Sequence, residues 1–143
     1  MAAMVKLGLL ILVASVFVGI CNGLCRYEVS TYTSNEDGAG TDAPIIFKLY
    51  DKEGLITTRT ASSLGGAYER GSTDTFTNHG ERCADPCRIT LALHWTAYLI
   101  PGSTWIPDTV DVNVYEDGLK YQRHFLFVNK VYADSTRVIN ACK

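Results

Sequence analysis

The chain has 143 residues, of which 47% are hydrophobic and 20% charged, and its formal net charge is −2 at pH 7. An acidic chain lacks the excess of lysine and arginine that nucleic-acid-binding proteins present to phosphates, so no nucleic acid is expected among its partners. The length suits one domain, because a chain of this size buries about two-thirds of its unfolded surface around a single core.

The first 23 residues have the pattern of a secretory signal peptide. One positive charge, Lys6, precedes an uninterrupted apolar run from Leu7 to Ile20, and small residues follow near Gly23. The run is shorter than the roughly 20 residues of a membrane-spanning helix, although a retained signal anchor is the alternative. We expect a mature domain of residues 24–143 with 12 basic and 15 acidic side chains, a formal charge of −3, in the secretory pathway.

The remaining sequence predicts strands and no long helix. In most segments apolar and polar residues alternate with a period of two, or several apolar residues follow one another in a short run. No segment has the apolar spacing of an amphipathic helix over three turns. The alternation is explicit at Ile89, Leu91 and Leu93 and at Val110, Val112 and Val114. The predicted strands are residues 27–33, 44–50, a weak one within 55–64, 73–77, 87–94, 109–116, 121–128 and 136–141.

The turn Glu116-Asp117-Gly118-Leu119 joins two of these strands as a hairpin. Asp-Gly supplies the positive φ angles that a two-residue loop needs, so the flanking strands are expected to pair antiparallel. About eight short strands separated by turns in one domain predict two packed sheets. The fold class is therefore all-β, a two-sheet antiparallel β-sandwich.

Four cysteines follow the signal peptide, and an even number in an oxidising compartment predicts two disulfides. Of the three possible pairings we favour Cys83–Cys87, which closes a short loop, and Cys25–Cys142, which joins the ends of the domain. Loop-closure entropy gives the long bridge about 4.7 kcal/mol and the short one about 2 kcal/mol. Cys25–Cys142 is then expected to hold the fold.

No motif for catalysis is found in the sequence. It has no Gly-x-Ser-x-Gly elbow, no His-Glu-x-x-His pair and no phosphate-binding loop. His79, His94 and His124 are far apart and lie in predicted turns or strands, where a structural or surface role is expected. A metal site that joins Cys83 and Cys87 to His79 or His94 is an alternative to disulfides. We expect no enzymatic activity; a small hydrolase or inhibitor is the competing class.

Several short motifs, in this order, resemble the PLAT/LH2 domain, a β-sandwich found in lipoxygenases, lipases and a bacterial phospholipase toxin. They are Gly-Thr-Asp at 40–42, Leu-Tyr-Asp-Lys-Glu-Gly at 49–54, Gly-Ser-Thr-Asp-Thr-Phe at 71–76, and Trp-Ile-Pro at 105–107 before the valine strand. The likeness covers residues 26–132. It implies an eight-stranded sandwich that binds lipid or protein and does not catalyse.

Within that family the chain is most similar to small secreted plant proteins with one PLAT domain, the stress-associated and embryo-specific groups. These relatives share a cysteine before the first strand, a close cysteine pair and a cysteine at the C-terminus, as at Cys25, Cys83, Cys87 and Cys142 here. The resemblance implies a role in stress response or in seed or embryo development, in the apoplast or the endoplasmic reticulum.

Calcium is a further implication of the resemblance, because calcium-binding relatives supply carboxylate and amide oxygens from two neighbouring loops. The first loop here offers Asp37, the backbone of Gly40, and Asp42, but residues 57–68 contain neither Asp nor Asn. The structural alternative is that Asp42 accepts hydrogen bonds from the amides of its own turn and that Asp74 does likewise. Apart from this possible calcium, no cofactor is expected.

An apolar and aromatic connection between residues 95 and 107 is the strongest candidate for a binding site. Trp95, Tyr98, Leu99 and Ile100 are predicted to form a tip that enters a membrane lipid surface or a groove of a protein partner. The alternative is that they cap the core. Trp105 matches the buried tryptophan of the family and is expected in the core. We expect a monomer.

Carbohydrate binding is a third possibility, because β-sandwiches with exposed aromatic rings stack on sugars. It requires a flat row of tyrosine or tryptophan on one sheet face. Tyr115 and Tyr121, on adjoining predicted strands, are the candidates for such a row.

Overall fold

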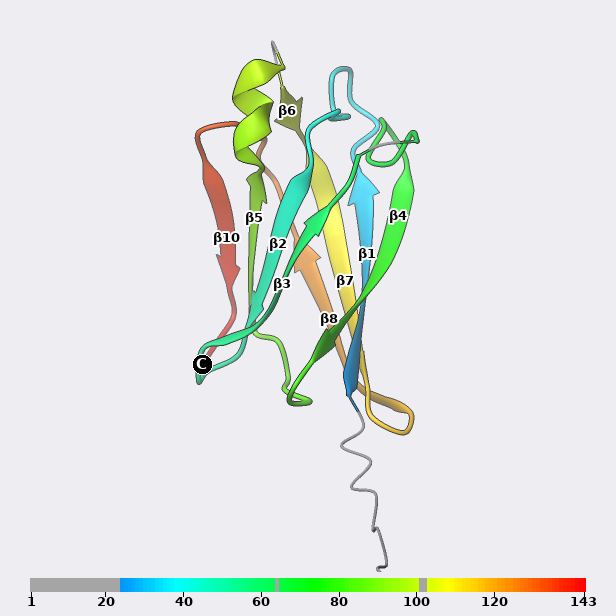
Figure 1. The fold of residues 1–143 in the computed structure, drawn as a ribbon, viewed down its shortest axis with the longest axis vertical. Helices are drawn as coiled ribbons and strands as arrows, with labels where there is room; N and C mark the ends of the chain where they lie inside the picture. Colours follow the sequence, from blue (N-terminus) through cyan, green and yellow to red (C-terminus); the bar gives the residue numbers. More distant parts are fainter. Residues whose placement is uncertain (1–23, 64, 101–102) are drawn as a thin grey trace, which may run out of the picture.

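The structure is a computed structural model, and it describes residues 24–63, 65–100 and 103–143 (Figure 1). The predicted signal peptide lies outside the described residues. The elements in chain order are β1 (Cys25–Thr33), β2 (Ile45–Tyr50), β3 (Leu55–Ala61), β4 (Thr73–Gly80), β5 (Arg88–Leu93), the 3₁₀ helix η1 (Trp95–Leu99), β6 (Thr104–Trp105), β7 (Pro107–Tyr115), β8 (Leu119–Leu126), β9 (Val131–Tyr132) and β10 (Thr136–Asn140). All eight predicted strands are present, with ends displaced by three residues or fewer.

The prediction of an antiparallel sandwich is confirmed. One four-stranded sheet has the order β4-β1-β7-β8 and the other the order β10-β5-β2-β3, and every pairing is antiparallel. The strands of both sheets run along the long axis of the molecule (Figure 1). A third, small pair, β6 with β9, was not predicted, because two-residue strands carry no periodicity.

The core lies between the two sheets and follows the predicted alternation. Every second residue of β5 is buried, and Val110, Val112 and Val114 of β7 have no exposed surface. Trp105 is fully buried, as expected, and its ring meets that of Phe47 edge to face, with centroids 6.1 Å apart. Side chains from both sheets thus fill one continuous interior.

The hairpin between β7 and β8 also matches the prediction. Asp117 and Gly118 both have positive φ angles, 54° and 139°, and the amide of Glu116 donates to the carbonyl of Gly118 at 2.9 Å. Gly tolerates this backbone region without steric cost, and Asp is among the few other residues that visit it. The turn fixes the register that places the three valines of β7 inward.

The expected disulfide pairing is wrong: the bridges are Cys25–Cys83 and Cys87–Cys142. The register explains both. Cys25 pairs with Gly80 at the end of β4, close to Cys83, while Arg88, next to Cys87, pairs with Asn140 shortly before Cys142.

Residues 84–86 do not close a short loop, because they cross from β4 in one sheet to β5 in the other. Each bridge instead connects the chain at the ends of two neighbouring strands of one sheet, over sequence separations of 58 and 55 residues. By loop-closure entropy each then contributes about 4 kcal/mol, so neither one alone holds the fold.

Candidate interaction end of the sandwich

One end of the sandwich gathers the segments that were predicted to carry function. Helix η1, the loop between β1 and β2, and the loop between β3 and β4 lie together at this end, which we call the interaction end (Figure 1). The start of β1, the β7–β8 hairpin and the C-terminus lie at the opposite end (Figure 1). Because loops of a sandwich cluster at its two ends, segments far apart in sequence meet there.

Helix η1 places three large side chains on the surface. Trp95, Tyr98 and Leu99 are 64%, 65% and 72% exposed, and we call these three residues the η1 tip. Ala97 is buried and Ile100 packs partly buried against the core. The alternative reading, that the segment caps the core, therefore holds for Ala97 and Ile100 and is wrong for the η1 tip.

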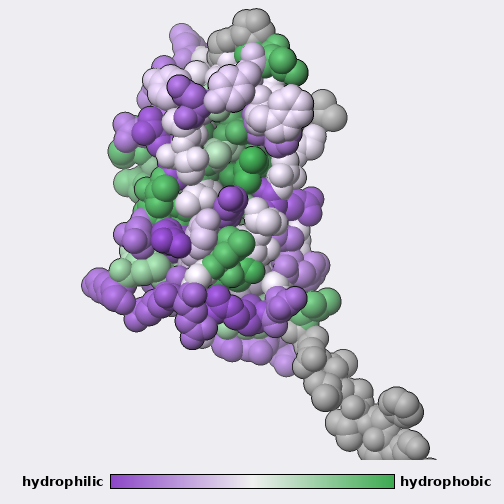
Figure 2. All heavy atoms as spheres, turned by 60° about the vertical axis from the view of Figure 1, so that its left-hand side comes forward, coloured by the Kyte–Doolittle hydropathy of each residue, from purple (hydrophilic) through white to green (hydrophobic). Residues whose placement is uncertain are grey.

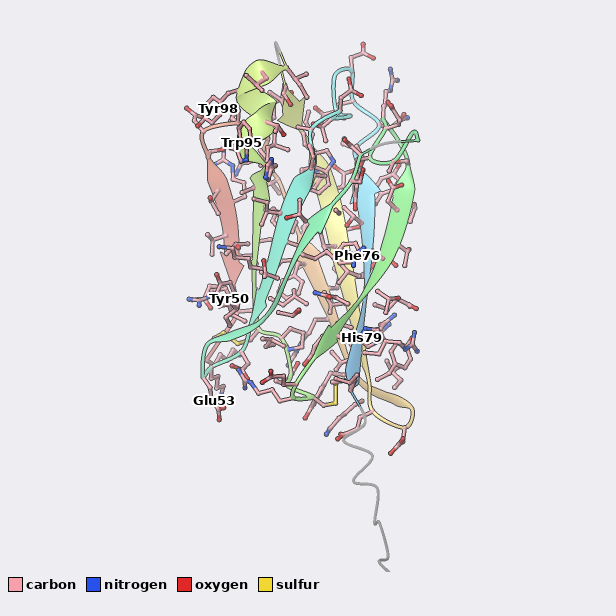
Figure 3. All side chains as sticks on the ribbon, in the orientation of Figure 1. Tyr50, Glu53, Phe76, His79, Trp95 and Tyr98 are labelled. Atoms are coloured by element: carbon pink, nitrogen blue, oxygen red, sulfur yellow. A yellow bond between two sulfur atoms is a disulfide. The ribbon has the colours of Figure 1, made fainter. Side chains whose placement is uncertain are left out.

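Figures 2 and 3 show the surface and the side chains of the interaction end. Trp95 and Tyr98 project from η1 at the interaction end (Figure 3). On the face drawn in Figure 2, apolar side chains lie at this end and also along the middle of the molecule, and a band of hydrophilic side chains crosses the opposite end. None of the helices in the described part of the chain is long and apolar enough to cross a membrane.

The η1 tip rests on a rigid base. The side chain of His94 caps η1 by accepting from the amide of Thr96, and the backbone amide of His94 donates to the carbonyl of Pro44 at 2.8 Å. Beneath the helix, the indole nitrogen of Trp105 donates to the hydroxyl of Thr33 at 3.0 Å. These contacts anchor the N-terminal end of η1 to the sandwich.

A small hollow of about 260 Å³ lies between the two loops beside η1, and we call it the loop hollow. It is lined by Gly38, Gly40, Thr41, Asp42, Glu69 and Arg70. The loops are fastened together by the amide of Thr41, which donates to the carbonyl of Tyr68 at 3.1 Å. A side chain in place of Gly40 would be crowded, because a Cβ atom at this position would lie 3.1–3.2 Å from backbone atoms of residues 68–70.

The carboxylates of these loops have different roles from those expected. Asp74 accepts from a backbone amide, as expected, but the donor is Tyr68, six residues earlier, at 2.8 Å and not an amide of its own turn; the hydroxyl of Ser72 also donates to it at 2.6 Å. Asp42 is exposed, and its turn is closed instead by Thr41, whose hydroxyl accepts from the amide of Ala43 at 3.1 Å. Burial, together with the charge of Asp74, raises the pKa of Tyr68 to about 12.

Arg70 lines the loop hollow and contacts oxygen atoms of the neighbouring loop between β1 and β2. Its guanidinium pairs with the carboxylate of Asp37, and its Nε donates to the carbonyl and the side-chain oxygen of Asn35 at 2.8 and 3.2 Å. Of the predicted calcium ligands, Asp37 is therefore held by Arg70, while Gly40 and Asp42 line the hollow. The described residues include no group of three or more His, Cys, Asp or Glu side chains placed to hold a metal ion.

Sequence reasoning missed Asn35, Glu69 and Arg70. It considered residues 57–68 as the second loop, whereas Glu69 and Arg70 follow directly and carry the polar groups. The signal in the sequence is the glycine at 71, whose φ angle of 72° marks a turn that extends the loop beyond residue 68. The contact of Asn35 with Arg70 depends on loop geometry and has no sequence signature.

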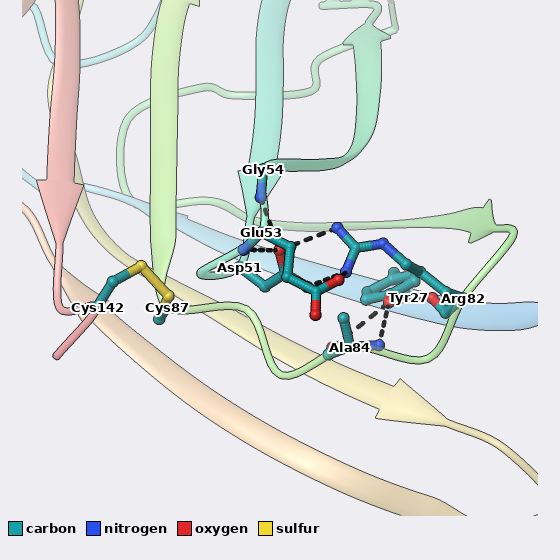
Figure 4. A network of polar contacts seen from close by, with 8 residues as sticks. All are labelled: Tyr27, Asp51, Glu53, Gly54, Arg82, Ala84, Cys87 and Cys142. Atoms are coloured by element: carbon teal, nitrogen blue, oxygen red, sulfur yellow. Dashed lines mark hydrogen bonds and ion pairs between the residues drawn. A yellow bond between two sulfur atoms is a disulfide. The ribbon is translucent and has the colours of Figure 1, made fainter.

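A larger hollow of about 640 Å³ lies at the opposite end and has charged walls. Asp51 receives two hydrogen bonds from the guanidinium of Arg82 and two from the amides of Glu53 and Gly54 (Figure 4). The bond from Arg82 is the main reason that the pKa of Asp51 lies below its ordinary value. The carbonyl of Arg82 in turn accepts from the buried hydroxyl of Tyr27 at 2.7 Å. This network fixes the crossover between the sheets.

The histidines do not form a catalytic arrangement. On the outer face of the first sheet, Ser30 lies opposite Asp111, and Asp111 lies opposite His124, whose Nδ1 is 2.6 Å from the Asp111 carboxylate. Asp111 thus separates the serine from the histidine, whereas a nucleophile needs the base beside it. The hydroxyl of Ser30 bonds to that of Thr75 at 2.8 Å. His94 caps η1 and His79 is exposed on β4.

Tyr115 and Tyr121 do not form the flat row that sugar stacking requires. Tyr121 lies opposite the buried Val114 and packs against the core, whereas Tyr115, the neighbour of Val114, points to the other face. Arg26 covers the ring of Tyr115, with its guanidinium carbon 3.9 Å from the ring centroid. The predicted pair is therefore split between the two faces of one sheet.

Fold, sequence and loop arrangement together define an all-β interaction module. Residues 27–140 match the PLAT/LH2 domain family, so the chain belongs to that family. PLAT/LH2 domains are non-catalytic modules that mediate lipid or protein interactions. The sequence is 28% identical over 134 residues to mouse lipoxygenase homology domain-containing protein 1, and that match covers 76% of this chain and 6% of the mouse protein.

Solved structures show the same fold. Coral 8R-lipoxygenase, described with calcium activation through a C2-like domain, superposes with a TM-score of 0.63 at 20% identity, over 80% of this chain and 16% of that one. A calcium-dependent 11R-lipoxygenase superposes with a TM-score of 0.59 at 22% identity, over 81% of this chain and 17% of that one. Clostridium perfringens alpha-toxin superposes with a TM-score of 0.61 at 21% identity, over 84% of this chain and 32% of that one. In each case the chain corresponds to a small part of a larger protein.

Proposed function

We propose that the protein is a non-catalytic module that attaches to lipid surfaces through the η1 tip. The observation that carries this proposal is the exposure of Trp95, Tyr98 and Leu99, three neighbouring large side chains on one short helix at the interaction end. Tryptophan and tyrosine suit a boundary between water and lipid, because one edge of the ring is polar and the body is apolar. Leu99 supplies a purely apolar contact.

The size of the η1 tip indicates reversible attachment. Burying one leucine side chain contributes about 1.5–3 kcal/mol, and each aromatic ring contributes a comparable amount. Three such residues give a gross gain on the order of 5 kcal/mol, from which the lost freedom of the bound protein must be subtracted. The mature domain is acidic, with 12 basic and 15 acidic side chains, so neutral surfaces are favoured over anionic ones.

The setting that we propose is the secretory pathway of a plant cell, outside the cell in the apoplast or inside the endoplasmic reticulum. Two disulfides support an oxidising compartment. The roles in stress response and in seed or embryo development rest on the resemblance to small secreted PLAT proteins. The protein acts as a monomer in this proposal.

Vesicle co-sedimentation tests the proposal. The protein, secreted as the full chain with both disulfides formed, is mixed with vesicles of neutral lipid, of neutral lipid with an anionic fraction, or with none. Wild type is expected to sediment with neutral vesicles, and the Trp95→Ala/Leu99→Ser double variant is expected to remain in solution. Leu55→Ser/Leu119→Ser is the matched control, because Leu55 and Leu119 are half-exposed on β3 and β8, away from η1.

The other outcomes separate the competing classes. A folded wild type that sediments with no vesicle contradicts lipid binding and assigns the η1 tip to a protein partner. If the Trp95→Ala/Leu99→Ser variant and the Leu55→Ser/Leu119→Ser control bind vesicles equally well, the η1 tip is not the lipid-binding site. Hydrolysis of a generic ester, abolished by changing a single serine or histidine, would contradict the non-catalytic assignment and support a small hydrolase.

A further inference from the structure

Arg70 lines the loop hollow at the surface of the protein, where its side chain is 51% exposed and that of its partner Asp37 is 94% exposed. Its guanidinium pairs with the carboxylate of Asp37, and its Nε donates to two oxygens of Asn35 at 2.8 and 3.2 Å. Asp42 and Glu69 line the same hollow. Carboxylate, amide and backbone oxygens are the atoms that Ca²⁺ prefers, and it takes six to eight of them. The guanidinium therefore engages groups of the kind that would hold calcium.

The backbone places Arg70 there by specific contacts. Gly40 lets the first loop approach so closely that a Cβ atom would lie 3.1 Å from the amide nitrogen of Arg70. On the other side, the amide of Gly71 donates to the carbonyl of Ser34 at 3.1 Å. Arg70 is thus held between two attachments of its loop to the loop that contains Asn35 and Asp37.

We propose that Arg70 takes the place of calcium in this protein. The guanidinium of Arg70 pairs with Asp37, links the two loops through Asn35 and sets the interaction end without a metal ion. A divalent ion entering the loop hollow is repelled by the charge of Arg70. In addition, the carboxylate of Asp37 is not free to bind the ion, because it is paired with Arg70. Regulation by calcium, described for two lipoxygenases of the same fold, is then absent here.

The role of Arg70 and the binding of lipid are tested by separate measurements. The first concerns ion binding at the loop hollow, whereas the second concerns the η1 tip. Failure of the vesicle experiment would leave the ion-binding result unchanged, and an unexpected calcium site in the wild type would leave vesicle binding to be measured separately.

The test is a calcium titration of the secreted full chain by calorimetry, with thermal unfolding in calcium and in chelator as a second readout. Arg70→Gln removes the charge and leaves Asp42 and Glu69 lining the loop hollow, with Asp37 in the adjoining loop free of its partner. Arg70→Lys keeps the charge. Arg59→Gln is the matched control, because it removes one charge from β3, where the Arg59 guanidinium lies over the ring of Phe76.

We expect Arg70→Gln to bind calcium about tenfold or more tightly than wild type and to gain a calcium-dependent rise in melting temperature. Wild type, Arg70→Lys and Arg59→Gln are expected to show neither change at millimolar calcium. Equal calcium affinity in wild type and Arg70→Gln would overturn the proposal. So would a wild-type melting temperature that rises with calcium and stops doing so in Asp42→Asn.

Discussion

Trp105 and Thr33 are joined by a hydrogen bond of 3.0 Å between the indole nitrogen and the hydroxyl, and both side chains are fully buried. The bond connects the last residue of β1 to the small β6–β9 pair and so ties the base of the interaction end to the first sheet. Its donor has no water in reach, because neither residue has exposed surface.

Thr33→Val is therefore expected to destabilise the domain by about 1–3 kcal/mol, since it leaves the indole N–H buried and unpaired while keeping the side-chain volume. Urea unfolding of wild type and variant measures the difference. Thr73→Val, at an exposed position at the start of β4, is the control and should change the free energy of unfolding by no more than about 0.5 kcal/mol. An equal effect of the two variants would contradict the role of the bond.

The disulfide pairing gives a second prediction. Digestion without reduction should yield peptides that join Cys25 to Cys83 and Cys87 to Cys142, as read by mass spectrometry. Removing either bridge by paired serine substitutions is expected to cost up to about 4 kcal/mol, because the closed loops have similar lengths. A Cys83–Cys87 peptide, or one bridge that carries nearly all the stability, would contradict the structure.

The contact between Asp51 and Arg82 predicts a pH dependence. The hydrogen bond from Arg82 holds the pKa of Asp51 below its ordinary value of 3.8, so the folded state favours the ionised form. This stabilisation is fully present above pH 3.8 and is lost as the pH falls through the lowered pKa.

Asp51→Asn should therefore lower the free energy of unfolding by about 1 kcal/mol at pH 7. This is less than the loss expected for a fully buried ion pair, because the Arg82 side chain is 39% exposed to solvent. The difference from wild type should shrink as the pH falls below 3.8. Chemical unfolding at a series of pH values measures it. Asp117→Asn, in the exposed hairpin turn, is the control. A difference that stays constant down to pH 2 would show that the contribution of Asp51 is not electrostatic.

Local signals in the sequence determined the eight main strands and the hairpin at residues 117–118, whereas the burial of Trp105 was expected from the resemblance to the PLAT/LH2 family. Alternation with a period of two reports which face of a strand is buried, and Asp-Gly reports its own backbone angles, so neither depends on distant contacts. The apolar composition of residues 95–100 was also readable. The sequence did not reveal whether these side chains are buried, because their exposure depends on which other segments pack over them.

Tertiary structure alone decided the disulfide pairing, the exposure of the η1 tip and the position of Arg70. Cys25 meets Cys83, and Cys87 meets Cys142, because strands far apart in the sequence pair in a particular register. Arg70 reaches Asn35 and Asp37 because Gly40 lets two loops approach. Sequence fixes the preferences of short segments, but the choice among partners tens of residues apart is made by the packing of the two sheets, which no local pattern encodes.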